Sequence, residues 1–150
     1  ETANFKKDAM RQIIKNIYPP SINNSREMVI LISASEIFLK YGYHGTTLSL
    51  IAKEAGVNKT NIHYYFRSKD NLYKKILELI IDLLVKTSFE ISSESKGFGR
   101  FRWFLVTEQY NNKTHFEKTL REIFATDYEQ KLNHINEWLN CPLNINLLRR

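Results

Sequence analysis

A chain of 150 residues, 43% of them hydrophobic, is long enough to bury a core, so one compact unit or two small ones are expected. The 25% of charged residues and the small numbers of Gly (5) and Pro (3) favour an all-α fold and exclude collagen-like and disordered chains. No apolar run approaches the roughly 18 residues that span a bilayer, and the first residues lack the apolar core of a secretory signal. A cytoplasmic location without a membrane partner is therefore expected.

The net charge of +6 is confined to the first half of the chain. Residues 1–25 carry four basic and two acidic side chains, residues 26–75 carry eight and four, and residues 76–150 carry ten of each. This excess suits a polyanionic partner, because neutralising phosphates supplies much of the affinity for nucleic acid. A modest excess of lysine is also common in soluble proteins, so charge alone leaves nucleic-acid binding open.

Residues 1–25 are expected to form an amphipathic N-terminal helical extension. From Asn4 to Ile17, apolar residues repeat every four positions opposite a basic stripe, and Pro19 and Pro20 stop the helix. The apolar face is narrow and the segment is short, which favours docking on the rest of the domain over a membrane-surface role.

The next predicted helix begins at Arg26, with Ser25 as its N-cap, and ends at Gly42. A turn is expected over residues 43–47. The apolar stripe of this helix consists of Val29, Ile30, Ala34, Ile37 and Phe38.

Two short helices in immediate succession follow this turn. Thr47 is the candidate N-cap of a helix from Leu48 to Ala55, Gly56 supplies a left-handed residue for a sharp reversal, and Asn58 caps the second helix. Two such helices joined by a tight turn predict a helix-turn-helix. The expected core anchors are Ile51, Ala52, Val57 and Ile62, with either Tyr65 or Phe66.

The second half of the chain also has helical periodicity. Ser68 is the N-cap of a longer helix that is predicted to run past Val85. A polar loop at residues 92–97 precedes two further helices, one around 101–110 and a last long one at about 114–140.

No pattern of catalytic or metal-binding residues is present. Cys141 is the only cysteine, and His63, His115 and His134 have no partner at the spacing of a catalytic triad or a metal site. Enzymatic activity, a metal and a cofactor are therefore not expected. A small enzyme or a structural module that carries a helix-turn-helix remains the less favoured alternative.

About 50 residues, from Arg26 to Ile76, closely resemble the DNA-binding domain of the tetracycline-repressor (TetR) family. The remainder of the chain matches no family pattern. The resemblance is carried by Ala34, Ile37, Phe38, Gly42, Thr46, Thr47, Leu48, Ile51 and Ala52, by the run from Ala55 to Phe66, and by the run from Ser68 to Leu72.

The resemblance implies a sequence-specific DNA-binding regulator with its helix-turn-helix domain at residues 26–75. The second short helix, at residues 58–64, would enter the major groove, with its N-terminal residues against base edges. Ile62, Tyr65 and Phe66 are expected to face inward. The candidate DNA-binding residues are Thr47, Lys59, Thr60, Asn61, His63, Tyr64 and Lys69.

Chemistry suggests a role for several of these residues. Asn61 suits adenine and Lys59 suits guanine or a phosphate, while Thr47 and Lys69 at helix starts and the hydroxyl of Tyr64 suit phosphates. Thr47 would also serve as a cap without DNA, and both lysines would also be stable in solvent.

Two of the candidate positions differ from the family's usual residues. The family commonly has a small residue where Thr60 stands and an aromatic residue where His63 stands. These departures concern the DNA sequence that is read rather than DNA binding itself.

For residues 76–150, the resemblance implies a divergent helical domain for dimerisation and regulation. A homodimer would place two reading helices on a palindromic operator as a repressor, and a small-molecule effector would release it. The candidate ligand-binding residues are Trp103, Phe104, Tyr110 and Phe124.

Aromatic residues at helical spacing are more often core than ligand contacts, so these four residues also fit a packed interior. Family members typically continue for several more helices, whereas 75 residues follow Lys75 here, so a small, incomplete or absent pocket is expected. The alternative is a DNA-binding regulator that is controlled by a protein partner and has no small-molecule ligand.

Overall fold

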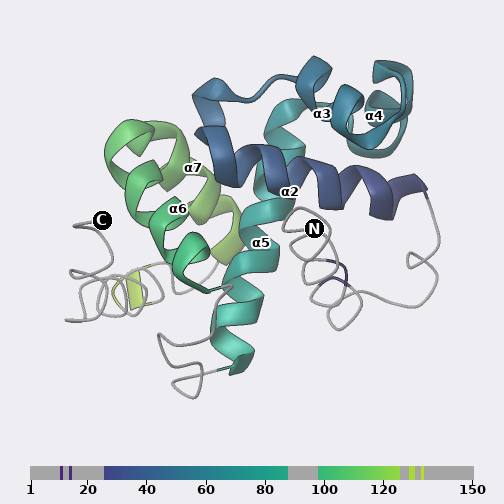
Figure 1. The fold of residues 1–150 in the computed structure, drawn as a ribbon. Helices are drawn as coiled ribbons and strands as arrows, with labels where there is room; N and C mark the ends of the chain where they lie inside the picture. Colours follow the sequence, from purple (N-terminus) through teal and green to yellow (C-terminus); the bar gives the residue numbers. More distant parts are fainter. Residues whose placement is uncertain are drawn as a thin grey trace. The chain divides into compact units, whose positions relative to one another are not determined.

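The computed structural model describes residues 26–87 and 98–125, with side chains described from 26 to 81 and from 100 to 125. Every regular element in these ranges is an α-helix, which confirms the predicted all-α class (Figure 1). The chain divides into two compact units, Glu1–Thr87 and Ser88–Arg150. The isolated positions that are also described are Arg11, Ile14, Glu129, Gln130 and Asn133.

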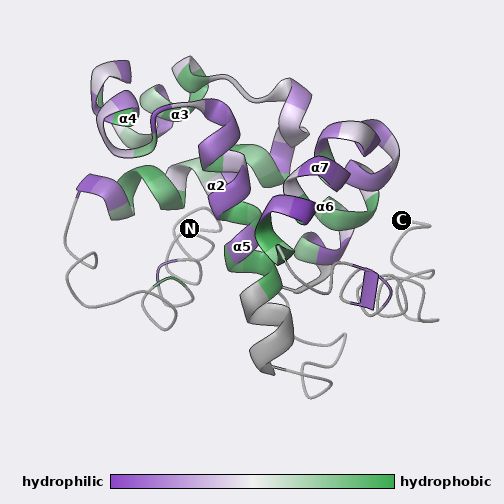
Figure 2. Cartoon of the chain, turned by 180° about the vertical axis from the view of Figure 1, so that it is seen from behind, coloured by the Kyte–Doolittle hydropathy of each residue, from purple (hydrophilic) through white to green (hydrophobic). Residues whose placement is uncertain are grey.

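The first unit is built around α2 (Arg26–Gly45). This helix contacts α3 (Leu48–Ala55), α4 (Lys59–Phe66) and α5 (Lys69–Thr87), and α4 also contacts α3 and α5. Figure 2 shows hydrophobic stretches on α2 and α5, the two long helices of this unit. The short helices α3 and α4 are therefore held on a scaffold of two long ones.

Burial on α2 extends over most of its circumference, because three helices contact it. Every side chain from Ile30 to Ser35 is buried, and Met28 is buried as well. Val29 is 37% exposed, so its predicted place in the core stripe is wrong. The predicted core positions that are confirmed are Ile30, Ala34, Ile37 and Phe38.

Gly42 interrupts α2 where the sequence predicted its end. Its φ of 74° lies in the left-handed region, and helical hydrogen bonding resumes over the next three residues, in the segment predicted as a turn. The buried hydroxyl of Thr46 donates to the carbonyl oxygen of Gly42 at 2.7 Å. Thr46 thus provides a partner for a carbonyl near the break and fixes the direction in which the chain leaves α2.

Helix α5 begins after Ser68, whose hydroxyl accepts a hydrogen bond from the backbone N–H of Asn71 at 3.1 Å. This confirms the predicted cap, and the helix runs to Thr87, past Val85 as predicted. The expected domain boundary after residue 75 falls inside α5, all of which belongs to the first unit. Two consecutive fully buried side chains, Ile76 and Leu77, lie directly beyond that expected boundary.

The second unit contains α6 (Phe98–Asn111) and α7 (Lys113–Phe124), which contact each other. The prediction of one uninterrupted helix over 114–140 is wrong, because Ala125 has a φ of 44° and its N–H closes the last turn on the carbonyl oxygen of Arg121 at 3.0 Å. No Gly or Pro marks this stop in the sequence. The described positions Glu129, Gln130 and Asn133 are helical again.

Most of the predicted N-terminal helix at 4–17 lies outside the described residues. Within it, Arg11 and Ile14 are helical, and Ile14 is fully buried. The predicted polar loop at 92–97 and the positions Cys141 and His134 also lie outside the described residues.

Candidate nucleic-acid interface

Helix α3 and the turn after it are fixed by local hydrogen bonds. Thr47 is in extended backbone, and its hydroxyl accepts from the N–H of Leu50 at 3.1 Å, which confirms it as the N-cap. Gly56 has a φ of 69°, and the N–H of Val57 donates to the carbonyl oxygen of Ala52 at 3.0 Å. This is the glycine-dependent helix end that the sequence predicted.

Helix α4 begins at a second side-chain cap. The Asn58 side-chain oxygen accepts from the backbone N–H of Asn61 at 3.1 Å. Ile62 is fully buried and Phe66 is 5% exposed, whereas Tyr65 is half-buried, so Phe66 is the second inward anchor of this helix. One face of α4 is thus held by its apolar side chains against the scaffold.

The opposite face of α4 is open to solvent. Tyr64 is 76% exposed, and its ring meets the ring of Tyr65 edge-on with centroids 5.0 Å apart. Asn61 is half-buried at the flank of this face. We call the exposed side chains the outward face of α4, which consists of Lys59, Thr60, His63 and Tyr64.

The ring of His63 is oriented by a contact to its own helix end. Its Nδ1 lies 3.1 Å from the carbonyl oxygen of Arg67, and a carbonyl only accepts, so Nδ1 carries the hydrogen. Arg67 in turn donates its N–H to the carbonyl oxygen of His63 at 3.0 Å and has a φ of 74°. In the neutral ring, Nε2 is therefore the hydrogen-bond acceptor.

A side-chain contact that local sequence patterns do not reveal joins the start of α2 to α4. The Nη1 of Arg26, at the start of α2, donates to Oδ1 of Asn61 at 3.2 Å. The two residues are 35 positions apart. The sequence predicts only that Arg26 begins a helix, because no local pattern indicates a contact between residues so far apart.

Lys69, a candidate phosphate contact, is half-buried at the start of α5 and lies over an aromatic ring. Its Nζ is 4.0 Å from the ring centre of Tyr43, a cation–π distance. The hydroxyl of Tyr43 donates to the carboxylate of Asp70. Burial, followed by this hydrogen bond and the negative charge of Asp70, raises the pKa of Tyr43 to about 12.

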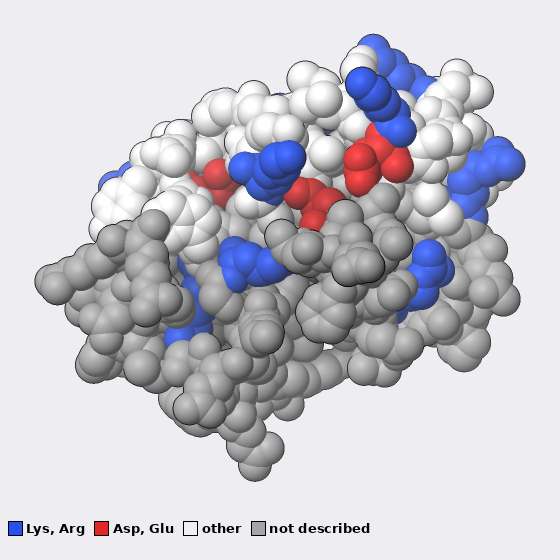
Figure 3. Space-filling model, in the orientation of Figure 1, with Lys and Arg blue, Asp and Glu red and all other residues white. Residues whose placement is uncertain are grey.

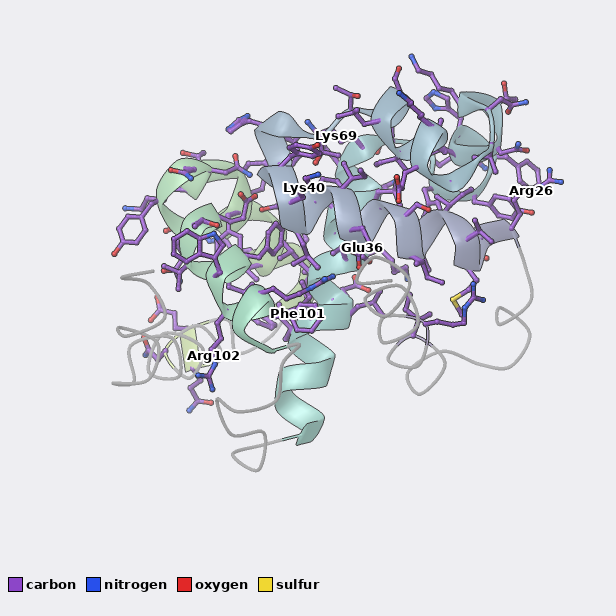
Figure 4. All side chains as sticks on the ribbon, viewed as in Figure 1. Arg26, Glu36, Lys40, Lys69, Phe101 and Arg102 are labelled. Atoms are coloured by element: carbon purple, nitrogen blue, oxygen red, sulfur yellow. The ribbon has the colours of Figure 1, made fainter. Side chains whose placement is uncertain are left out.

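The candidates extend along one end of the first unit. Figure 4 shows Arg26 beside α4 and Lys69 at the connection between α2 and α3. Figure 3 shows basic side chains in blue at the end formed by α3 and α4, with acidic side chains in red next to them. The surface thus combines dispersed positive charge with hydrogen-bonding side chains.

The four candidate ligand-binding residues do not share one environment. Phe104 and Phe124 are buried, at 1% and 7% exposure, whereas Trp103 and Tyr110 are 45% and 81% exposed. Trp103 and Tyr110 are seven positions apart, which places them on the same face of α6. Within the described part of the second unit, two of the four are core and two form an outer aromatic face.

The same unit buries polar groups that the sequence analysis did not single out. Arg102, Glu108 and Asn112 are 5%, 3% and 6% exposed. The Asn112 side-chain nitrogen lies 3.5 Å from a Glu108 carboxylate oxygen, at the outer limit of a hydrogen bond.

Among the described residues, no group of three or more His, Cys, Asp or Glu is arranged to hold a metal ion. None of the helices in the described ranges is long and apolar enough to cross a membrane.

Comparison with known proteins identifies relatives of this domain. Residues 30–76 match the family model of bacterial regulatory proteins, tetR family. The transcriptional regulator RutR of Escherichia coli K12 is 45% identical over 60 residues, which cover 40% of this chain and 28% of RutR. The transcriptional regulator QacR of Staphylococcus aureus is 29% identical over 115 residues, which cover 74% of this chain and 59% of QacR. The chain thus spans less than two thirds of either relative.

A crystal structure of an HlyIIR mutant protein superposes with a TM-score of 0.48 at 21% identity, covering 83% of this chain and 86% of that one.

Proposed function

Because residues 30–76 match the family model of bacterial regulatory proteins, tetR family, we propose that this chain is a sequence-specific DNA-binding transcriptional regulator of that family. The observation that carries the proposal is the construction of α4. Its inward side is anchored by Ile62 and Phe66, and its N-terminal turn presents polar side chains to solvent. The major groove of B-DNA, about 12 Å wide, accepts one such helix.

The outward face of α4 offers distinct chemistry to DNA. Lys59 and Thr60 stand in its first turn, the part of a recognition helix that meets base edges. Tyr64 can donate its hydroxyl to a phosphate, and the exposed Thr47 stands at the start of α3, where backbone N–H groups also suit a phosphate. In this proposal, Thr47 and Tyr64 position the domain, while Lys59, Thr60 and His63 read bases.

We further propose that two copies bind a palindromic operator. An eight-residue helix contacts few base pairs, so one copy provides limited specificity. Two copies whose reading helices are about 34 Å apart would meet successive major grooves and combine their specificities. Occupancy of such an operator would repress transcription by excluding other proteins from the site.

Control of the repressor has two candidate forms. In the first, a small-molecule effector binds the second unit and favours a spacing of the reading helices that does not fit DNA. In the second, a protein partner docks on the second unit. The exposure of Trp103 and Tyr110 on one face of α6 favours the second form, because exposed aromatic residues are typical of interaction surfaces.

The proposal is tested by selecting bound duplexes from a random DNA library and titrating the enriched pool against salt. Enrichment of a palindrome, with affinity that falls steeply with salt, is expected. Failure of the folded protein to enrich any sequence would contradict DNA reading. Enrichment of a single half-site, bound by one copy, would retain DNA reading and exclude the dimeric operator. A reporter gene placed behind the selected site then distinguishes repression from activation.

A further inference from the structure

The contact between Arg26 and Asn61 fixes the orientation of a side chain at the flank of α4. A guanidinium group has hydrogen-bond donors and no acceptor. Nη1 of Arg26 lies 3.2 Å from Oδ1 of Asn61, so the side-chain oxygen of Asn61 faces Arg26. The side-chain nitrogen of Asn61 consequently points away from Arg26.

The backbone of Asn61 is held as well. Its N–H donates to the side chain of Asn58 at 3.1 Å, so the residue is tied to the N-cap of α4 through its main chain and to α2 through its side chain. Asn61 is also half-buried, in contrast to its neighbours Lys59 and Thr60. These constraints organise the amide before any DNA is present.

Orientation of the amide decides which base edge it recognises. An unconstrained Asn pairs with adenine by accepting from N6–H and donating to N7 at the same time. When the carbonyl oxygen is directed to Arg26, the group offers the major groove mainly its NH2 donors. Guanine presents two adjacent acceptors there, N7 and O6, whereas adenine presents one acceptor beside a donor.

We propose that Arg26 is a specificity-determining positioning residue, which turns Asn61 into a donor that prefers guanine to adenine. This inference rests on the proposed DNA-reading function and deepens it. It replaces the expectation from sequence that Asn61 reads adenine. Arg26 acts through Asn61, and its exposed position at the start of α2 leaves the core of the first unit intact when it is changed.

The experiment repeats the library selection with the full chain and with Arg26→Ala. Wild type should select guanine at the base pair that Asn61 meets. In Arg26→Ala the freed amide should lower the guanine-to-adenine ratio there by about fivefold or more, the lower range of discrimination by one good contact. The base pair is identified as the one whose preference changes in Asn61→Ala.

Lys40→Ala is the matched control, because it removes the same charge from α2 at a residue that lies over the Tyr41 ring. It should leave the base preference unchanged. If Arg26→Ala weakens all sequences equally, as Lys40→Ala is expected to do, Arg26 serves as a general charge and the inference is overturned. If wild type selects no sequence at all, the proposed DNA-reading function is contradicted. That outcome differs from a wild type that selects a sequence whose base preference does not depend on Arg26, which contradicts only the role of Arg26.

Asn61→Asp provides a test that does not require Arg26 to be changed. The carboxylate keeps an acceptor for Arg26 and loses every donor, so the guanine preference should disappear, with cytosine favoured through its N4 donor. Retention of the guanine preference in Asn61→Asp would contradict the inference.

Discussion

Several side chains at the proposed DNA interface also have a structural role within the fold. Thr47 and Asn58 each accept the N–H that would otherwise be unpaired in the first turn of α3 or α4. The ring of Tyr43 lies under Lys69 and its hydroxyl binds Asp70, so that the end of α2 is joined to the start of α5. At the scale of single residues, Thr47 and Lys69 therefore stabilise the fold as well as being candidate DNA contacts.

Removing the cap of α3 should destabilise the first unit. We expect Thr47→Ala to lower the free energy of unfolding by about 1 kcal/mol, because the N–H of Leu50 loses its acceptor. Thr47→Ser keeps the hydroxyl and should cost much less. Urea denaturation of the two variants measures the difference, and equal stability would show that the cap contributes nothing.

Tyr43 should make stability sensitive to alkaline pH. Its pKa of about 12 exceeds the usual value near 10, so the folded state holds the phenolic proton more tightly than the unfolded chain does. This contribution is complete below about pH 10 and is lost as the pH rises through about 12. The stability of wild type should therefore fall in that window more than that of Tyr43→Phe, measured by denaturation at each pH.

The same substitution separates two contributions. Near neutral pH, Tyr43→Phe should cost about 1 kcal/mol for the lost hydrogen bond to Asp70. The ring that Lys69 covers is retained in Phe. Parallel pH profiles for wild type and Tyr43→Phe would contradict the assigned role of the hydroxyl.

At the scale of elements, the helix-turn-helix was predictable because its signals are local. A cap and the helix it starts are within three residues of each other, and Gly56 takes a backbone angle that few other residues adopt. The contact of Arg26 with Asn61 depends on how α2 and α4 pack, which no local pattern encodes. The early end of α7 was missed because Ala125, a strong helix former, carries the positive φ.

Substitutions of Gly56 test how much the left-handed turn between α3 and α4 contributes to stability. A Cβ at this position would meet no atom within 4 Å, so Gly56→Ala introduces backbone strain without a clash. We expect a loss of about 1 kcal/mol in stability. Gly56→Asn should lose less, since Asn tolerates the left-handed region. Thermal unfolding followed by circular dichroism measures the stability of the three proteins, which should decrease from wild type to Gly56→Asn to Gly56→Ala.

At the scale of the whole molecule, affinity for DNA depends on the number of phosphates that are neutralised. The chain's positive excess lies in its first half, and the described part of that half contains the proposed interface.

The second unit was less predictable: Phe104 and Phe124 are in its core, whereas Trp103 and Tyr110 are on its surface. Aromatic periodicity indicates helices but does not tell which aromatic residues pack together.

The salt dependence of DNA binding tests whether each lysine contributes a phosphate contact. The slope of log K against log salt changes by about 0.9 for each phosphate contact. Lys69→Ala should reduce the slope by about one unit and lower affinity for all sequences alike, provided that Lys69 leaves the Tyr43 ring for a phosphate. An unchanged slope would mean that Lys69 holds the α2–α5 junction only. Lys59→Ala should also change the base preference if Lys59 reads guanine.

The division of roles within α4 bears on how such a protein can evolve. Asn58 starts the helix, and Ile62 and Phe66 bury it, while Lys59 and Thr60 stand on the other side. Substitutions at the outward positions would leave the caps and core untouched, so a duplicated gene can acquire a new binding site in a few steps without passing through an unfolded intermediate. Within α4, the residues that anchor the helix and the outward residues that we propose to read bases are separate sets, so selection can act on one set while preserving the other.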